Sequence, residues 1–171
     1  ALGHADGMVT GVTRNFATAL EDVLRAIDPA RGERAMGMSI ILSKGRTLFV
    51  ADTSVAEFPD APELAQIVMQ AAAMAKQFGV TPRVALVSAS TFGNPKMERS
   101  EKIRDAVSIL DRREDMEFEY EGEMSVDVAL NPNIRELYPF SRLSEAANVL
   151  VMPAIHSASI STSLLATAGD A

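Results

Sequence analysis

Two segments rich in hydroxyl side chains contain the main candidates for ligand binding or catalysis. Residues 88–93 read Ser-Ala-Ser-Thr-Phe-Gly, and residues 153–162 contain one histidine and four hydroxyl groups. Small hydroxyl side chains beside the free backbone N–H groups of a helix start can bind an anion such as phosphate. The same residue types also cap helices and stabilise turns. An anion site and a purely structural role are therefore both open from these residues alone.

Each segment follows a short apolar run, and this placement predicts where the segments lie. Residues 83–88 and 149–152 read as strands buried on both faces, as in a parallel sheet. Ligands of open α/β sheets bind beyond the carboxyl ends of the strands, so we expect the two segments to share a candidate ligand site. Its residues are Ser88, Ser90, Thr91, Phe92, Gly93, His156, Ser157 and Ser159.

Basic residues near the N-terminus could pair with such an anion. Arg14 directly precedes Asn15, which is expected to cap a helix that extends to about residue 27. A phosphate at this helix start would be favoured by the helix dipole and by the guanidinium group. Thr13, Arg14 and Asn15 therefore join the candidate site. Arg25, within the same helix, is a further candidate that could equally be exposed to solvent.

Other polar residues give weaker signals. Asp52, at the end of a predicted strand, is a candidate base or ligand clamp, and a turn or capping role is equally open. His156 has apolar neighbours in its loop, which favours a hydrogen-bonded structural residue over a general base. Acidic residues alternate with other types within 114–123, and this period predicts a solvent-facing strand that blocks edge pairing rather than a metal site.

The sequence lacks the motifs of several catalytic classes. It has neither a dinucleotide-binding glycine fingerprint nor a P-loop. It has no cysteine and two histidines, which excludes disulfides and thiolate sites and argues against a multi-histidine metal centre. No nucleophile elbow accompanies the histidines, so no Ser-His-Asp triad is predicted. We therefore predict no catalytic and no metal-binding residue in this chain.

Composition narrows the class of protein. The chain has 171 residues, 47% of them hydrophobic and 23% charged, with a net charge of −7. The negative charge disfavours nucleic acids and anionic membranes as partners, and no apolar run reaches the ~20 residues of a membrane span. No secretory pattern is present, so a cytoplasmic protein is predicted. The first residue is not Met, which indicates a piece of a longer chain.

Hydrophobic periodicity predicts an α/β fold with a layered, mostly parallel sheet, one β-hairpin and flanking helices. The expected strands are 36–42 and 47–51, which form the hairpin, together with 83–88, 117–120 and 149–152. The expected helices cover about 15–27, 63–78, 98–113, 125–130 and 159–168.

The order and spacing of these segments resemble the phosphate acetyltransferase/butyryltransferase family over essentially the whole chain. More closely, the sequence resembles the phosphotransacetylase-like C-terminal region of long bacterial NADP-dependent malic enzymes. The stretches that carry the resemblance are 3–16, 49–53, 82–93, 122–124 and 149–161. Within them, Thr13-Arg14-Asn15-Phe16 and His156-Ser157-Ala158-Ser159-Ile160-Ser161 favour the malic-enzyme branch.

The resemblance implies one lobe of a two-lobed α/β protein with a cleft between the lobes. It implies that residues 1–35 are a leading loop and helix toward the other lobe, and that residues 36–171 are the main α/β lobe. It also implies a homodimer formed largely through this lobe. An arginine after the Gly-rich loop binds phosphate in active members, and Arg25 is its nearest match.

The chain departs from active members where their polar groups matter most. Their catalytic Ser-Arg pair, with a nearby Asp, lies beyond Ala171. They read Pro-Asp-Leu-Asn-x-Gly-Asn after the last strand, where this chain has Ala154, His156 and Ser159 at the acid and amide positions. Acyl transfer needs these fixed groups, whereas binding needs a shaped cleft and a few anchors.

These departures lead to an expected function. We expect a regulatory and oligomerising domain that binds acetyl-CoA as an allosteric effector and is not itself catalytic. The malic enzyme catalytic region, with NADP and a divalent metal, is expected elsewhere in the same longer chain. One alternative is part of an active phosphate acetyltransferase, which converts acetyl-CoA and phosphate into acetyl phosphate and CoA. The other is a dimerisation scaffold without a ligand.

Overall fold

The computed structural model describes residues 6–43 and 45–169, which divide into two compact units at Ala35/Met36. The first unit contains helix α1 (Phe16–Ala26). Asn15 caps this helix, since its side chain accepts a hydrogen bond from the backbone N–H of Thr18 at 2.9 Å. The predicted cap and helix are therefore confirmed.

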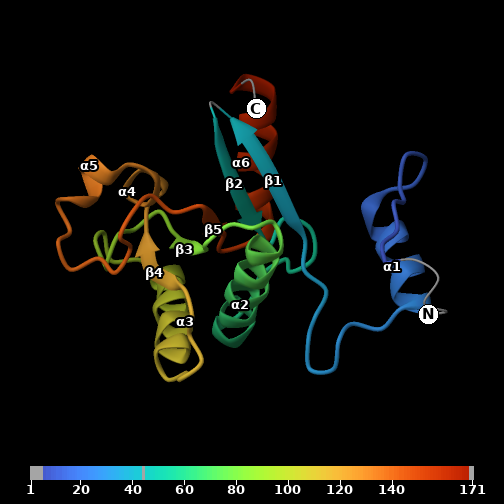
Figure 1. Ribbon diagram of the computed structural model, residues 1–171, viewed down its shortest axis with the longest axis horizontal. Helices are drawn as coiled ribbons and strands as arrows, with labels where there is room; N and C mark the ends of the chain where they lie inside the picture. The colour runs from blue at the N-terminus through green and yellow to red at the C-terminus, as the bar shows by residue number, and fades with distance from the viewer. Residues whose placement is uncertain (1–5, 44, 170–171) are drawn as a thin grey trace. The chain divides into compact units, whose positions relative to one another are not determined.

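The second unit is built on a five-stranded sheet with the strand order β1-β2-β5-β3-β4 (Figure 1). The strands are β1 (Met38–Ser43), β2 (Arg46–Ala51), β3 (Arg83–Val87), β4 (Glu119–Met124) and β5 (Val149–Val151). β1 pairs antiparallel with β2, and the other neighbours are parallel. The predicted fold class and hairpin are confirmed, while Lys44, in the predicted turn, lies outside the described residues.

Strand β5 lies between β2 and β3, and its apolar sequence explains this central position. Val149 pairs with Phe49 on one side and with Val84 on the other. All three residues of β5 are buried, as expected for a strand covered on both faces. The last residues of β2, β5 and β3 therefore end at one edge of the sheet.

Helices cover both faces of the sheet. They are α2 (Ala61–Gln77), α3 (Glu101–Asp111), α4 (Val126–Leu130), α5 (Pro132–Arg135) and α6 (Ile155–Ala168). A capping box formed by Asp60 and Glu63 starts α2. Helices α2 and α3 pack in one hydrophobic core with Phe49, Val84 and Val149. Helices α4 and α6 contribute to a second core on the opposite face of the sheet.

This arrangement creates a topological switch point between two neighbouring strands. The chain leaves β3 toward α3 on one face of the sheet, and it leaves β5 toward α6 on the other face. β3 and β5 are adjacent, so their outgoing segments diverge beyond the carboxyl ends. Such a switch point is where open α/β sheets bind ligands.

Several predicted boundaries are wrong, each for a local reason. The helix expected from residue 159 begins at Ile155, and its N-cap, Ala154, has no side chain that could signal the start. The helix expected from residue 98 begins as a 3-10 turn, η1 (Glu98–Ser100). The strand expected at 117–120 runs from Glu119 to Met124. Within residues 6–43 and 45–169, no helix is long and apolar enough to cross a bilayer.

Candidate functional site

The loop after β3 is held by a buried carboxylate from the end of β4. Oε1 of Glu123 accepts hydrogen bonds from the Ser90 hydroxyl and, at 3.0 Å, from the backbone N–H of Gly93. The main-chain oxygen of Glu123 also accepts a hydrogen bond from the N–H of Phe92 at 2.9 Å. One residue of the neighbouring strand therefore fixes three positions of the predicted ligand loop.

The charge of Glu123 is balanced by α3. The side chain of Glu123 is fully buried, and its Oε2 lies 2.8 Å from Nη1 of Arg104. The prediction that the alternating acidic residues face solvent is wrong here, because Glu121 and Glu123 are both buried. Each is instead paired with an arginine from another segment, which removes the cost of burying an isolated charge.

The remaining hydroxyl groups of this loop are also engaged within the protein. Ser88 and Ser100 share a hydrogen bond of 2.7 Å, which ties the end of β3 to the start of α3. Thr91 donates its hydroxyl to the hydroxyl of Ser125 at 2.9 Å and accepts a bond from the Ser125 N–H at 3.0 Å. All five candidates from Ser88 to Gly93 therefore have polar contacts that stabilise the turn.

Phe92 adopts a backbone conformation that is uncommon for a residue with a side chain, with φ of 48°. Its ring lies 5.4 Å from the ring of Tyr138 and 4.8 Å from that of Phe140, centre to centre. The hydrogen bonds to Glu123 hold the turn in this conformation. The ring of Phe92 is thereby placed among these aromatic neighbours.

Asp52, the candidate base, has a structural role. It is buried, and its carboxylate accepts hydrogen bonds of 2.7–3.1 Å from four backbone N–H groups. These donors belong to Gly37, Ser54, Val55 and Ala56. The carboxylate thus stabilises the turn after β2, which is the turn role left open by the sequence.

The candidates after β5 lie in the first turns of α6 rather than in a loop. His156 is exposed, with Nε2 3.8 Å from Oε1 of Glu57 and its ring 5.8 Å from the ring of Phe58. The Ser157 hydroxyl donates to the carbonyl of Ala154 at 2.7 Å. Ser159 is exposed on the same helix. His156 has no buried carboxylate or nucleophile beside it among the described contacts.

Sequence reasoning missed Lys102, which lies at the same edge of the sheet. Its Nζ donates to the carbonyl of Pro153 at 2.8 Å and to that of Pro59 at 3.0 Å. Burial and, secondly, the charge of Arg99 lower the pKa of Lys102, while Asp60 opposes them. Its place in the first turn of the helix after β3 was the available signal, because that turn must face the carboxyl edge.

The candidates of the first unit have partners within that unit. Arg14 forms an ion pair with Asp22, and Arg25 lies 3.3 Å from the same carboxylate and 3.7 Å from that of Glu21. The N–H of Thr13 donates to the carbonyl of Gly11 at 2.8 Å. These side chains are exposed, and Asn15 is occupied as the cap of α1.

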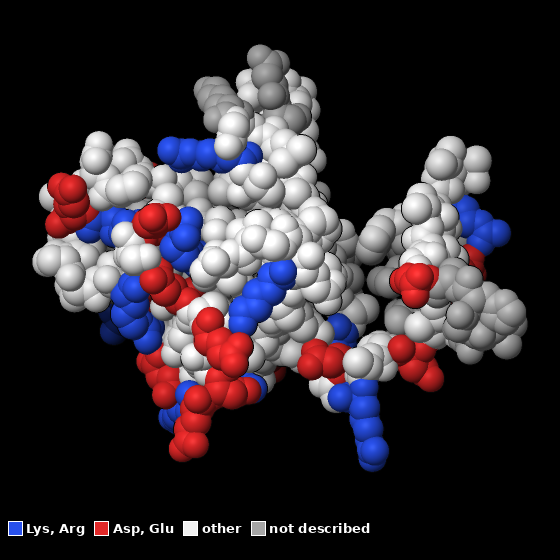
Figure 2. Space-filling view, in the orientation of Figure 1, with Lys and Arg blue, Asp and Glu red and all other residues white. Residues whose placement is uncertain are grey.

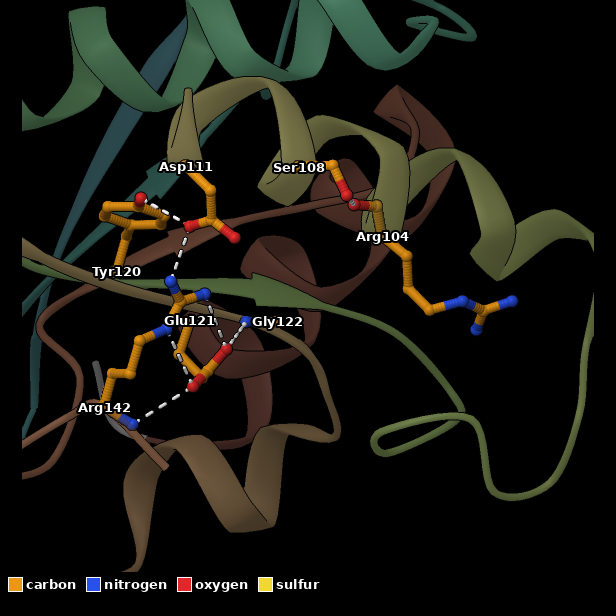
Figure 3. Close-up of polar contacts among 7 residues, drawn as sticks. All are labelled: Arg104, Ser108, Asp111, Tyr120, Glu121, Gly122 and Arg142. Carbon is orange, nitrogen blue, oxygen red and sulfur yellow. Dashed lines mark hydrogen bonds and ion pairs between the residues drawn. The ribbon is translucent and has the colours of Figure 1, made fainter. Parts of the chain in front are cut away.

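A second charged cluster joins α3, β4 and the segment before β5 (Figure 3). Arg142 lies between two carboxylates, with Nη1 2.6 Å from Asp111 and Nη2 3.1 Å from the buried Glu121. Tyr120 donates its hydroxyl to Asp111 at 2.7 Å. Burial and this hydrogen bond raise the pKa of Tyr120 to about 12. In Figure 3 the side chain of Arg104 points away from this cluster.

These contacts attach the edge strand β4 to α3 and to the segment before β5. Burial raises the pKa of Asp111, but the hydrogen bonds from Tyr120 and Arg142 outweigh it and leave the pKa below its ordinary value. Burial likewise opposes the charge of Arg142, yet its bonds to Glu121 and Asp111 raise its pKa. Asp111, Tyr120 and Arg142 therefore keep their usual protonation states near neutral pH, so the cluster has a structural role.

Most polar groups at the carboxyl ends of β3 and β5 are engaged within the protein. In the part of the chain that the structure describes, no three His, Asp or Glu side chains are grouped to hold a metal ion. The hydroxyl groups after β3 are bonded to carboxylate, hydroxyl or backbone partners. Lys102 and the first turn of α6 lie beyond the carboxyl ends of β3 and β5.

Comparison with known proteins identifies relatives of two kinds. Over residues 1–171, the sequence matches the family described as phosphate acetyl/butaryl transferase. It is 61% identical over 169 residues to the NADP-dependent malic enzyme of Rhizobium meliloti, a match that covers 99% of this chain and 22% of that enzyme. It is 34% identical over 160 residues to the phosphate acetyltransferase of Bacillus subtilis, covering 92% of this chain and 49% of that protein.

Solved structures agree with the fold. A phosphotransacetylase from Streptococcus pyogenes superposes with a TM-score of 0.87 at 28% sequence identity, covering 97% of this chain and 51% of that one. A phosphotransacetylase from Staphylococcus aureus gives a TM-score of 0.82 at 26% identity, with 88% and 47% covered. The chain therefore spans about half the length of these structures.

Proposed function

Because the chain belongs to the phosphate acetyl/butyryl transferase family, we propose that it is the phosphotransacetylase-like regulatory part of an NADP-dependent malic enzyme. It binds acetyl-CoA as an allosteric effector, assembles the enzyme into a homodimer, and carries out no acyl transfer of its own. The catalytic region, with NADP and a divalent metal, lies in another part of the longer polypeptide. The span of 22% of a malic enzyme that is 61% identical supports this assignment.

The observation that carries the proposal is the engagement of the loop after β3. Ser90, the most buried hydroxyl of this loop, donates to Glu123, and that carboxylate is neutralised by Arg104. A general base must keep a free lone pair within reach of the proton it abstracts. A carboxylate already bonded to a hydroxyl, an N–H and a guanidinium lacks that freedom, so binding is favoured over catalysis.

Ligand binding fits the divergence of the segments after β3 and β5. An acyl-CoA presents phosphate groups and a flexible arm, which need cations and a crevice rather than a catalytic base. To act as an effector, acetyl-CoA must bind one state of the enzyme more tightly than another. The loop after β3, α3 and the start of α6 meet beyond the strand ends, and they are the elements that would differ between these states.

Oligomerisation is supported by an apolar surface on β1 and α6. Leu42, on the edge strand, is 66% exposed, and Ile160, on α6, is 67% exposed. Leu164 is exposed on the same helix. The surface over the hairpin and α6 is mostly free of charged side chains in the view of Figure 2. Edge strands and large apolar patches are surfaces that proteins cover by association, and the proposed occupant is a second copy of this chain.

The proposal is tested on the full-length protein that contains these residues. Malate oxidation with NADP is measured while acetyl-CoA is titrated, and acetyl phosphate formation from acetyl-CoA and phosphate is assayed in parallel. We expect malate oxidation to depend on acetyl-CoA and acetyl phosphate formation to stay at background. Malate oxidation that ignores acetyl-CoA would leave the dimerisation scaffold as the better description.

A second candidate function is acyl transfer to phosphate. It is favoured by the 34% identity with a phosphate acetyltransferase over 92% of this chain. The same assay decides, because sustained formation of acetyl phosphate by the full-length protein would place this function first. A CoA-dependent rate that survives removal of the upstream malic enzyme region would establish it for this part of the chain.

A further inference from the structure

We propose that Lys102 and Arg99 form a phosphate-binding position beyond the carboxyl ends of β3 and β5. This inference rests on the proposed function of the same site and adds the residues and the chemical group they would bind. The ligand chemistry is a phosphate group, carried either by an acyl-CoA or by inorganic phosphate. Neither residue belongs to the candidate site that the sequence predicts.

The position of Lys102 is set by three segments that meet at the carboxyl edge. Lys102 lies in the first turn of α3, two residues after Ser100, whose hydroxyl is bonded to Ser88 at the end of β3. Its ammonium reaches the carbonyl of Pro153, which follows β5, and that of Pro59, which precedes α2. The charged group therefore lies where the connections of adjacent strands diverge.

The charge at this position is only partly compensated. Lys102 makes no ion pair with a carboxylate in the described ranges 6–43 and 45–169, and both of its hydrogen-bond acceptors are neutral carbonyls. An ammonium has three donors, so one N–H is left for another acceptor. Asp60 lies close enough to stabilise its charge, but not close enough for an ion pair.

Arg99 adds a second positive charge three residues before Lys102. It is exposed, and it forms no ion pair with the carboxylates of the described residues. Its charge acts on Lys102 in the direction that disfavours a second cation. The neighbouring acids Glu98 and Glu101 are exposed, and Glu101 lies 3.8 Å from Arg104. An anion bonded to both cations would relieve their mutual repulsion, and a phosphate oxygen accepts from ammonium and guanidinium alike.

The test uses calorimetric titration of the full-length protein with acetyl-CoA and, separately, with inorganic phosphate. The variants are Lys102→Met, Arg99→Met and the double variant, with Lys76→Met as the control. Lys76 lies near the far end of α2 and pairs with Glu117. We expect Kd for acetyl-CoA to rise about tenfold in Lys102→Met and several-fold in Arg99→Met, since each removes one charge-assisted bond. The control should leave Kd unchanged.

Two comparisons keep the result decisive. Within the described ranges, the Arg99 side chain has no hydrogen bond or ion pair to lose, so Arg99→Met tests the position even where Lys102→Met lowers the melting temperature. Wild-type binding that neither variant changes by more than twofold would overturn the inference while leaving the proposed function in place. A protein that binds inorganic phosphate through Lys102 but ignores acetyl-CoA would keep the inference and overturn the effector. Binding of neither ligand by the wild type would overturn both.

Discussion

Arg104 of α3 reaches a carboxylate that solvent does not touch: its Nη1 lies 2.8 Å from Oε2 of Glu123, whose side chain is 0% exposed. The side chain of Arg104 is 35% exposed. The ion pair therefore connects the exposed side of α3 to a buried position in β4. The opposite oxygen of Glu123 holds Ser90 and Gly93. One ion pair thus supports the loop that borders the proposed ligand site.

Replacing Arg104 with Met should lower the free energy of unfolding by ~3 kcal/mol, because the buried partner is left uncompensated. The double variant Arg104→Met/Glu123→Gln should recover part of this loss, since it removes the unpaired charge. Urea denaturation measures both. The control is Arg113→Met, which removes a surface pair with Asp115 and should leave the midpoint unchanged. Equal midpoints for Arg104→Met and Arg113→Met would contradict the prediction.

Acid sensitivity should arise in part from Glu119. The backbone N–H of Ser144 holds the pKa of Glu119 below its ordinary value of 4.5; burial opposes this, and the Ser144 hydroxyl adds to it. A folded-state pKa below the unfolded one stabilises the protein above the ordinary value, and this stabilisation disappears as the pH falls through the folded-state pKa. Glu119→Gln should therefore be less stable than the wild type at neutral pH, with a gap that closes in acid. Thermal melts across pH measure this, and a gap that stays constant would refute it.

Charged substitutions in the apolar surface of β1 and α6 should weaken association of the full-length protein. Leu42→Glu and Leu164→Glu place charges on β1 and α6, where burial against a second copy would be costly. Sedimentation velocity at micromolar concentration should show a smaller species for both. Leu137→Glu, at another exposed leucine, which lies before β5, is the matched control and should sediment like the wild type. Unchanged sedimentation of all three variants would remove β1 and α6 from the interface.

Arg14→Ala should weaken the effect of acetyl-CoA on malate oxidation in the full-length protein by several-fold. Arg14 lies just before the cap of α1, where its guanidinium and the helix start both favour an anion, although Asp22 competes for the same charge. The measurement is the acetyl-CoA concentration that gives half the maximal effect. Arg31→Ala, in the exposed turn after α1, serves as control. An unchanged half-effect concentration would exclude Arg14 from the site.

Elements with a strong period were predictable from the sequence. The alternation of apolar residues in 38–51 sets the hairpin register, and the spacing from Leu64 to Ala75 buries one face of α2. The runs at 84–87 and 149–151 lie in central strands, because only strands covered on both faces bury successive side chains. These signals depend on neighbours within a few residues.

The parts that were missed depend on residues far apart in the chain. Glu123 looks solvent-facing within its own strand, and only Arg104 and the loop after β3 make its burial favourable. Lys102 gains its position from the carbonyls of Pro59 and Pro153, which lie more than 40 residues away on either side. The hydroxyl groups from Ser88 to Thr91 were correctly placed at the edge, but their partners could not be read from local sequence.

The hydrogen bond from Lys102 to the carbonyl of Pro153 links α3 to the start of α6. Pro153 lies two residues before α6, a helix of 14 residues that spans about 21 Å. A rigid rod of that length turned by roughly 5° about its first residue carries its tip through about 2 Å. A change in this one hydrogen bond would therefore move the far end of α6 more than its start. A polypeptide packed against that far end would be displaced.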